Sequence, residues 1–279
     1  MRKMKKSIYI LAVISMIIGG CDKIDEPYLE PIGTGGENEV TITVEFLDDV
    51  NGSFDLNVFI IEDGIIAPQK NDEASVGPTP DWLNYEHNHM LRASLTSTWG
   101  VDLADDPANG TMITKEFSFA IDAGWDLQNL SFLVFITDGN TFEVLQASEQ
   151  SLSDPMVHTH EKVVLLEEFT GHLCVNCPEA TKLAHDLKET YEEQLVLLSI
   201  HAGALAEPGG EPYSTDFQTA VGTGIYNQFS PVGVPTGMVN RTEYQGGVVL
   251  FKDSWESAIQ EMIGKPQQAS IEITVTLAE

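Results

Sequence analysis

The stretch Val163–Ala184 constrains the fold more than any other part of the chain. It opens with Val163 to Leu166, an apolar and β-branched run typical of a strand that is buried on both faces. Two cysteines, Cys174 and Cys177, follow after a short polar segment. Beyond them, apolar residues recur at helical spacing, at Ala180, Leu183, Ala184, Leu187 and Tyr191. The sequence therefore predicts a buried strand, a Cys-x-x-Cys pair and a helix in direct succession.

The position of the pair at the start of a helix has a chemical consequence. Unpaired backbone N–H groups and the positive end of the helix dipole favour an anion there, and the thiolate is the form that attacks a disulfide. Pro178 suits the first turn, because the N–H group that it lacks would have no partner in the helix. We interpret the pair as a thiol–disulfide redox site, in which the more exposed Cys174 attacks and Cys177 resolves the mixed disulfide.

The N-terminus has the pattern of a targeting signal. Basic residues precede the apolar run Ile8–Ile18, which is short for a membrane span. The tetrapeptide Ile18-Gly19-Gly20-Cys21 resembles the lipobox of bacterial lipoproteins. That resemblance implies removal of residues 1–20, a lipid anchor on Cys21, and an outer-membrane location, either periplasmic or surface-exposed. An ordinary cleaved secretory signal is the alternative.

After the targeting signal, the sequence predicts a flexible tether followed by an all-β domain. Residues 21–38 combine acidic residues, Pro and Gly without periodicity, as in a flexible tether. Residues 39–150 contain short alternating segments, such as Val40–Phe46, and the hairpin signal Asn51-Gly52. Within them, residues 67–88 have a loop-like composition. The pattern predicts an antiparallel immunoglobulin-like β-sandwich.

The second half predicts an α/β domain over residues 163–266, after a linker at 151–162. Its elements are expected in the order strand, helix, strand, helix, strand, strand, helix, at 163–169, 174–193, 195–200, 215–229, 238–241, 248–251 and 253–264. This βαβ…ββα order, with the cysteine pair opening the first helix, resembles thioredoxin-like domains. The predicted fold class is therefore α/β plus all-β, in two domains.

The thioredoxin-like resemblance extends to two further site elements. It implies a cis-proline at Pro235 beside the cysteines, with Val234 and Thr236 contacting a bound peptide. It also implies that Glu168 is a buried acid that exchanges a proton with Cys177. Burial at the end of a strand would raise the pKa of this carboxyl. The alternative is a half-solvated carboxylate at the strand edge.

Other features leave the role of the pair open. Leu173 stands where thioredoxins carry Trp, and no basic residue lies between the cysteines, so the disulfide could turn over rarely or be vestigial. A zinc site is a further alternative, with His158, His160 and His172 as candidate ligands, but a second Cys-x-x-Cys pair is absent from the sequence. We therefore predict no metal and no cofactor. His87 and His89 are expected on the surface or in a turn.

The net charge of −29 argues against two classes of partner. Such a chain repels nucleic acids and anionic lipid headgroups. The expected partners are protein thiols and disulfides of the cell envelope, and the membrane itself through the lipid on Cys21.

Four blocks of sequence resemble the Omp28 family of Bacteroidota lipoproteins. They are residues 58–69, 85–100, 163–180 and 234–241. The resemblance implies a lipid-anchored envelope protein with a thioredoxin-like domain and a β-sandwich, although here the sandwich precedes the thioredoxin-like part. The terminal segment 269–279 alternates Ile271, Ile273 and Val275 with polar residues, and such a strand needs a sheet. We predict that it pairs antiparallel with residues 40–46 and completes the N-terminal sandwich, as in a circular permutation of the family order. The alternatives are that it extends the thioredoxin-like sheet or belongs to a second sandwich.

Two functional hypotheses follow from these observations. The first is an envelope thiol–disulfide oxidoreductase or redox-linked chaperone that uses Cys174 and Cys177. The second is a non-enzymatic surface binding or adhesin-type lipoprotein in which the same pair is a structural or vestigial disulfide.

Overall fold

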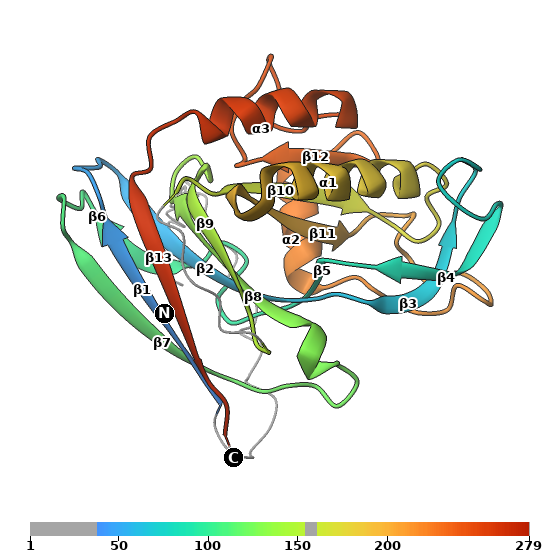
Figure 1. Ribbon diagram of the computed structural model, residues 1–279, viewed down its shortest axis with the longest axis horizontal. Coiled ribbons are helices and arrows are strands. Elements are labelled where there is room, and N and C mark those ends of the chain that lie inside the picture. Colours follow the sequence, from blue (N-terminus) through green and yellow to red (C-terminus); the bar gives the residue numbers. More distant parts are fainter. Residues whose placement is uncertain (1–37, 154–160, 279) are drawn as a thin grey trace, which may run out of the picture.

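The chain folds into a mixed α/β structure that is mostly sheet (Figure 1), as a computed structural model describes it for residues 38–153 and 161–278. The strands in this part of the chain are β1 (Asn38–Phe46), β2 (Ser53–Glu62), β3 (Ile65–Lys70), β4 (Asp81–His87), β5 (Met90–Ser94), β6 (Val101–Asp105), β7 (Met112–Phe119), β8 (Leu130–Asp138), β9 (Val144–Ser151), β10 (Val164–Thr170), β11 (Leu195–His201), β12 (Thr236–Val239) and β13 (Ala269–Thr276). The helices are α1 (Cys177–Tyr191), α2 (Ala220–Phe229) and α3 (Trp255–Ile263), with short 3-10 turns at Leu127–Asn129, Glu192–Gln194 and Lys252–Ser254. The predicted lipidation site Cys21 and the histidines His158 and His160 lie outside the described residues.

The strands of the described residues form three sheets. A long sheet has the order β12-β10-β11-β5-β2-β8-β9, with β6 also paired to β2. A three-stranded sheet has the order β13-β1-β7, and β3 pairs with β4 in a separate hairpin. The long sheet runs through both predicted domains, because Ser199 of β11 pairs in parallel with Met90 of β5.

The predicted antiparallel pairing of the C-terminal strand with residues 40–46 is confirmed. β13 pairs antiparallel with β1 from Glu39 opposite Thr276 to Phe46 opposite Ala269. In Figure 1 the two strands run side by side although they come from opposite ends of the described chain. Their alternating apolar residues, including Ile42 and Ile273, are buried in one core with residues of β2 and β8. The pairing thus fastens the end of the chain to its first strand.

Helices cover both faces of the β12-β10-β11 part of the long sheet. The apolar stripe predicted for α1 is present, because Ala180, Ala184 and Leu187 are buried against β10 and β11. Trp255, Ile259 and Met262 of α3 share the same core. Ile225 of α2 packs in the core of the opposite face.

Three local predictions were wrong. Residues 67–88 form much of the β3–β4 hairpin instead of a loop; its inward-facing positions carry Gln69 and His87 as well as Ala67 and Tyr85, so hydrophobic alternation is weak. The predicted strand 248–251 is reduced to an isolated bridge between Leu250 and Gly237. The helix predicted from residue 215 starts at Ala220, where the hydroxyl of Thr219 accepts a hydrogen bond from the Gly222 N–H.

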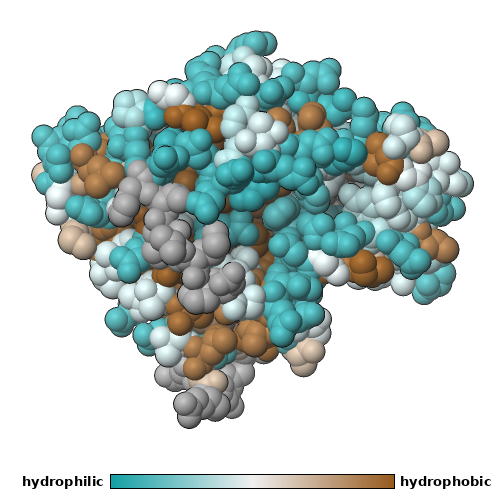
Figure 2. Space-filling view, viewed as in Figure 1, coloured by the Kyte–Doolittle hydropathy of each residue, from teal (hydrophilic) through white to brown (hydrophobic). Residues whose placement is uncertain are grey.

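The visible surface fits the strongly acidic composition. On the face in Figure 2 hydrophilic residues cover most of the area, and hydrophobic residues lie in separate patches. In the described part of the chain, none of the helices has the length and apolar character needed to span a membrane.

Candidate functional site: a covered disulfide above a polar pocket

Cys174 and Cys177 are joined in a disulfide, with their Cα atoms 5.4 Å apart. Cys177 is the first residue of α1, and Cys174 lies in the loop that leads to it from β10. The two side chains are only 2% and 1% exposed. The two cysteines are thus almost equally buried, because neighbouring segments cover both, and the attacking role of Cys174 stays a prediction.

The β3–β4 hairpin covers the loop that carries Cys174. The side-chain amide of Gln69 donates hydrogen bonds to the carbonyl oxygen of Cys174 at 2.9 Å and to that of Gly171 at 3.3 Å. The backbone N–H of Lys70 donates to the carbonyl of His172 at 2.8 Å. The covering segment thus satisfies backbone carbonyls that a bound peptide could otherwise use.

The segment 202–217 borders the same loop from another side. The backbone N–H of Leu173 donates to the carbonyl of Leu205 at 3.0 Å. Gly171 lies so close to Leu205 that an added Cβ would stand 2.5 Å from the Leu205 carbonyl oxygen. Only glycine fits this position without a backbone shift.

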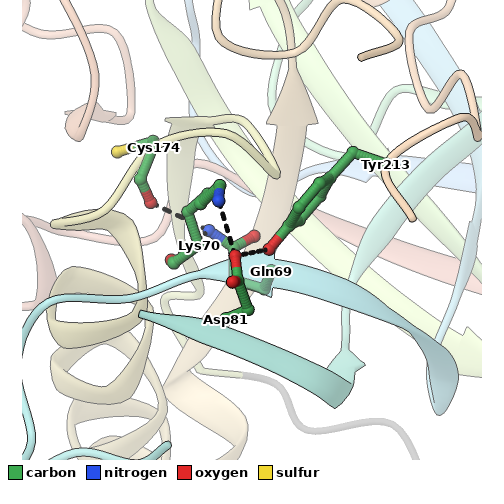
Figure 3. Close-up of polar contacts among 5 residues, drawn as sticks. All are labelled: Gln69, Lys70, Asp81, Cys174 and Tyr213. Carbon is green, nitrogen blue, oxygen red and sulfur yellow. Dashed lines mark hydrogen bonds and ion pairs between the residues drawn. The ribbon is translucent and has the colours of Figure 1, made fainter. Parts of the chain in front are cut away.

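An ion pair and a phenol connect the hairpin to the segment 202–217. The carboxylate of Asp81 accepts hydrogen bonds from Lys70 Nζ at 2.5 Å and from the hydroxyl of Tyr213 at 2.6 Å. Figure 3 shows both donors converging on Asp81, while Gln69 points to the carbonyl of Cys174. The contacts with Lys70 and then Tyr213 lower the pKa of Asp81. We call Lys70, Asp81 and Tyr213 the latch.

A small pocket lies beneath the hairpin and reaches Cys177. His87 of β4 and His201 of β11 line it, together with Tyr85 and Thr181. Each histidine is only 4% exposed, so the prediction that His87 lies on the surface or in a turn is wrong. Burial lowers the pKa of His87 to about 4 and that of His201 well below its ordinary value. Both imidazoles are therefore neutral at neutral pH.

The nitrogens of these imidazoles are unusual for buried polar atoms. Nε2 of His87 and both ring nitrogens of His201 have no hydrogen-bond partner within the described residues. Most buried polar groups in folded proteins have one. The rings themselves pack against Phe217, at centroid distances of 5.2 and 5.3 Å.

Glu168 lies on β10 and is 3% exposed, which excludes the half-solvated alternative. The hydroxyl of Thr181 donates to its Oε1 at 2.9 Å. Burial raises the pKa of Glu168 to about 8, against the opposing effect of this hydrogen bond. Since Thr181 also lines the pocket with Cys177, it connects the carboxyl to the disulfide side of the pocket.

The cis peptide bond expected at Val234–Pro235 is present. It precedes β12, which pairs antiparallel with β10, so that Thr236 lies opposite Phe169. Val234 and Pro235 are half-buried and Thr236 is buried. A contact between Pro235 and the sulfurs, and the peptide-binding roles of Val234 and Thr236, stay predictions.

The candidate zinc ligand His172 takes part in ring packing. Its ring stacks on that of Tyr213 at a centroid distance of 6.0 Å, and burial lowers its pKa. Within residues 38–153 and 161–278, no cluster of three or more His, Cys, Asp or Glu side chains is arranged to hold a metal ion.

The sequence alone did not identify His87, His201, Tyr85 or Thr181 as site residues. One signal was available, because Tyr85 and His87 are two positions apart and would share a face of any strand. The contribution of His201 depends on the parallel pairing of β10 with β11, which places Thr170 opposite His201.

Comparison with known proteins gives one family. Residues 33–154 match the family model described as "Outer membrane protein Omp28", which confirms the resemblance over that part of the chain. A crystal structure of a domain of the outer membrane lipoprotein Omp28 from Porphyromonas gingivalis is similar over 42% of this chain and 88% of that domain, at 14% identity and a TM-score of 0.22. No curated protein matches the chain. The matched segment ends before β10 and the disulfide.

Proposed function

We propose that this chain, which is an Omp28-family protein over residues 33–154, is a lipid-anchored outer-membrane protein with a thiol–disulfide redox centre at Cys174–Cys177. Residues 1–20 would be the signal peptide, Cys21 the lipidated residue and 21–38 the tether. Residues 39–150, completed by β13, would form the sandwich, and residues 163–266, after a linker, a thioredoxin-like unit.

Several features support the thioredoxin-like unit. β10 and β11 are parallel and are connected through α1, and the disulfide lies at the start of that helix. β12 is antiparallel to β10 and follows the cis-proline. α3 closes the same core as α1.

The observation that carries the redox proposal is the polar pocket beside Cys177. A disulfide that only staples the loop needs no acid and no imidazole beneath it, and burying such groups without full hydrogen bonding costs free energy. Yet a carboxyl with a pKa of about 8 lies one hydrogen bond from a residue that lines the pocket. A group with that pKa can accept and return a proton near neutral pH.

The proposed reaction transfers two electrons to a partner disulfide. The thiolate of Cys174 attacks one partner sulfur, forms a mixed disulfide and releases the other partner sulfur as a thiolate. The thiolate of Cys177 then attacks Cys174, which closes the Cys174–Cys177 bond and releases the second partner thiolate. The protons of the two cysteines end on the two partner thiols, and the ionised form of Glu168, a minor species below pH 8, receives the proton of Cys177 through Thr181 in transit.

A second candidate is favoured by the burial of the disulfide. With both cysteine residues only 1–2% exposed, a partner protein cannot reach their sulfurs in this conformation. On this alternative the protein is a non-enzymatic surface binding or adhesin-type lipoprotein, and the disulfide is structural.

Trapping in cells separates the two candidates. The Cys177→Ser variant cannot resolve a mixed disulfide, so partner proteins should remain attached through Cys174 and separate on reduction. The double variant Cys174→Ser/Cys177→Ser is the control. Absence of attached partners, together with no activity of the wild-type protein in insulin reduction, would favour the binding function.

Metabolic labelling tests the anchor. The wild-type protein should incorporate labelled palmitate and sediment with membranes, and Cys21→Ala should abolish both. Continued labelling of Cys21→Ala would contradict the lipobox interpretation.

A further inference from the structure

We propose that His201 and His87 are hydrogen-bond partners of the free Cys177 sulfur, so that the N-terminal hairpin and β11 together stabilise the reduced cysteine pair over the disulfide. This inference deepens the proposed function and rests on Cys174–Cys177 acting as a redox couple. It assigns a role to a residue of the N-terminal half, His87, in chemistry that takes place at the start of α1.

His201 supplies a hydrogen-bond donor in either tautomer. A neutral imidazole carries one N–H donor and one bare acceptor nitrogen. Both nitrogens of His201 lack a partner among the described residues, and the side chain is 4% exposed. One buried N–H group is therefore unpaired whichever nitrogen carries the proton, in a pocket that Cys177 also lines.

His87 supplies the complementary acceptor. Nε2 of its ring has no partner among the described residues. With the proton on Nδ1, Nε2 is a bare acceptor. This tautomer is part of the proposal.

Reduction changes what the Cys177 sulfur can offer these groups. A disulfide sulfur carries no proton and is a poor acceptor, so the imidazoles gain little from it. A thiolate is a strong acceptor for the N–H of His201, and a thiol can donate to Nε2 of His87. Opening the disulfide therefore provides partners for nitrogens that lack them in the oxidised state, which favours the reduced pair.

The other titratable groups around the pocket do not oppose a thiolate. Glu168, behind Thr181, is neutral below its pKa of about 8, and burial keeps the pKa of Tyr85 above its usual value. His172, in the loop before Cys174, is close enough to lower the pKa values of both His87 and His201. An anion at Cys177 thus meets dipoles and no charged carboxylate at neutral pH.

A glutathione equilibrium tests the proposal on the purified protein, without its signal segment. In this reaction two glutathione thiols reduce the Cys174–Cys177 bond, glutathione disulfide forms, and the two thiol protons pass to the cysteines. We would compare wild type with His201→Phe and His87→Phe, since phenylalanine keeps the ring contacts with Phe217 and removes the nitrogens. The control is His185→Phe, which changes a histidine of α1 that lines a different pocket. The incubation is long because glutathione reaches the buried sulfurs slowly.

We expect His201→Phe to lower the equilibrium constant for reduction about tenfold, which corresponds to about 30 mV for this couple, and His87→Phe to lower it less. The pH profile of Cys177 alkylation in a Cys174→Ser background should move to higher pH in His201→Phe. Circular dichroism establishes that each variant is folded, and His201→Leu, which also lacks a side-chain donor, serves as a second variant if Phe disturbs packing. Equal constants and equal pH profiles for folded variants and wild type would overturn the inference.

The outcomes are separable from those of the proposed function. If trapping finds partners but the variants leave the equilibrium unchanged, the redox function stands and the roles of His201 and His87 fall. If the equilibrium shifts but trapping finds no partner, the imidazoles stabilise the reduced pair in a protein that does not exchange disulfides with others.

Discussion

Glu167 and Glu168 are adjacent residues of β10, and both are buried, but Glu167 has a charged partner and Glu168 has a neutral one. Glu167 points to one face of the strand and forms a bidentate ion pair with Arg241, with both distances 2.7 Å and neither side chain exposed. The Arg241 guanidinium also lies over the rings of Phe135 and Phe229, at 5.2 and 5.6 Å. Glu168 points to the other face, has a single hydroxyl partner in Thr181, and has a raised pKa.

We call the side of β10 that carries Glu167 the structural face and the side that carries Glu168 the chemical face. A buried carboxylate opposite a guanidinium stays charged and holds its surroundings in one geometry. A buried carboxyl with one neutral partner changes protonation near neutral pH, and unpaired imidazoles and a disulfide lie close to it. One strand thus separates a charge-paired carboxylate, although Nη1 of its Arg241 partner lacks a hydrogen bond among the described residues, from a carboxyl without a charged partner next to unpaired imidazoles.

The largest expected effect is a loss of stability after mutation of the Glu167–Arg241 pair on the structural face of β10. Arg241→Met leaves the charge of Glu167 buried without a partner and should lower the free energy of unfolding by about 3–5 kcal/mol. Urea denaturation of the oxidised protein measures it. Lys182→Met, which removes the exposed pair between Lys182 and Asp186 on α1, is the control and should cost no more than about 0.5 kcal/mol. A loss for Arg241→Met as small as that of the control would contradict the contrast between the faces.

The second effect is on pH dependence and belongs to Glu168. Because its folded-state pKa of about 8 is above the ordinary value of 4.5, the folded protein holds a proton that the unfolded chain releases between these pH values. The wild type should therefore lose stability as pH rises through that window, by on the order of 1 kcal/mol per pH unit at most. Below and above the window this contribution is constant.

Glu168→Gln should remove that slope, because glutamine does not titrate. Urea midpoints measured from pH 4 to pH 9 would show the variant gaining stability relative to wild type as pH rises. Glu193→Gln, at an exposed carboxylate after α1, is the control and should follow the wild-type curve. Parallel curves for Glu168→Gln and wild type would show that Glu168 is already ionised in the folded protein.

The chemical face was only partly predictable from sequence. The strand, the cysteine pair and the helix stripe follow from local patterns, because each is encoded within about twenty neighbouring residues, whereas the burial of Glu168 was implied only by the resemblance to thioredoxin-like domains. The pairing of β13 with β1 was also predictable, since an amphipathic terminal strand needs a sheet. The register then brings Ile273 opposite Ile42.

The cover over the disulfide could not be found in the same way. Residues 67–88 carry Pro, Asn and Asp in a pattern that is typical of loops, and their inward side is polar, since Gln69 and His87 face the cysteine loop. Nothing in the periodicity near Cys174 indicates that a segment about a hundred residues earlier donates to its carbonyl. Such contacts depend on tertiary packing, which is why the sequence did not predict the burial of Cys174.

The smallest expected change in stability comes from mutation of the latch. This mutation tests whether the β3–β4 hairpin, which covers the loop of Cys174, can open. The Glu167–Arg241 pair is fully buried, whereas the Lys70–Asp81 pair that holds the hairpin has side chains 34% and 41% exposed. Exposed pairs contribute little, so Asp81→Asn should leave the unfolding transition almost unchanged. It weakens the contacts of Lys70 and Tyr213 with residue 81, and the hairpin should then open more often above Cys174.

We therefore expect Asp81→Asn to speed reduction of the disulfide by dithiothreitol up to about fivefold, without moving the glutathione equilibrium, because the latch contacts neither sulfur. Tyr213→Phe, which removes one of the two donors to Asp81, should give a smaller acceleration. Asp186→Asn, at the exposed pair on α1, is the matched control. Rates that are equal in all four proteins would mean that the hairpin does not limit access and that the sulfurs are reached by another route. A shifted equilibrium in Asp81→Asn would instead show that the cover sets the redox balance directly, and the distinction between a removable cover and the polar pocket beneath it would fail.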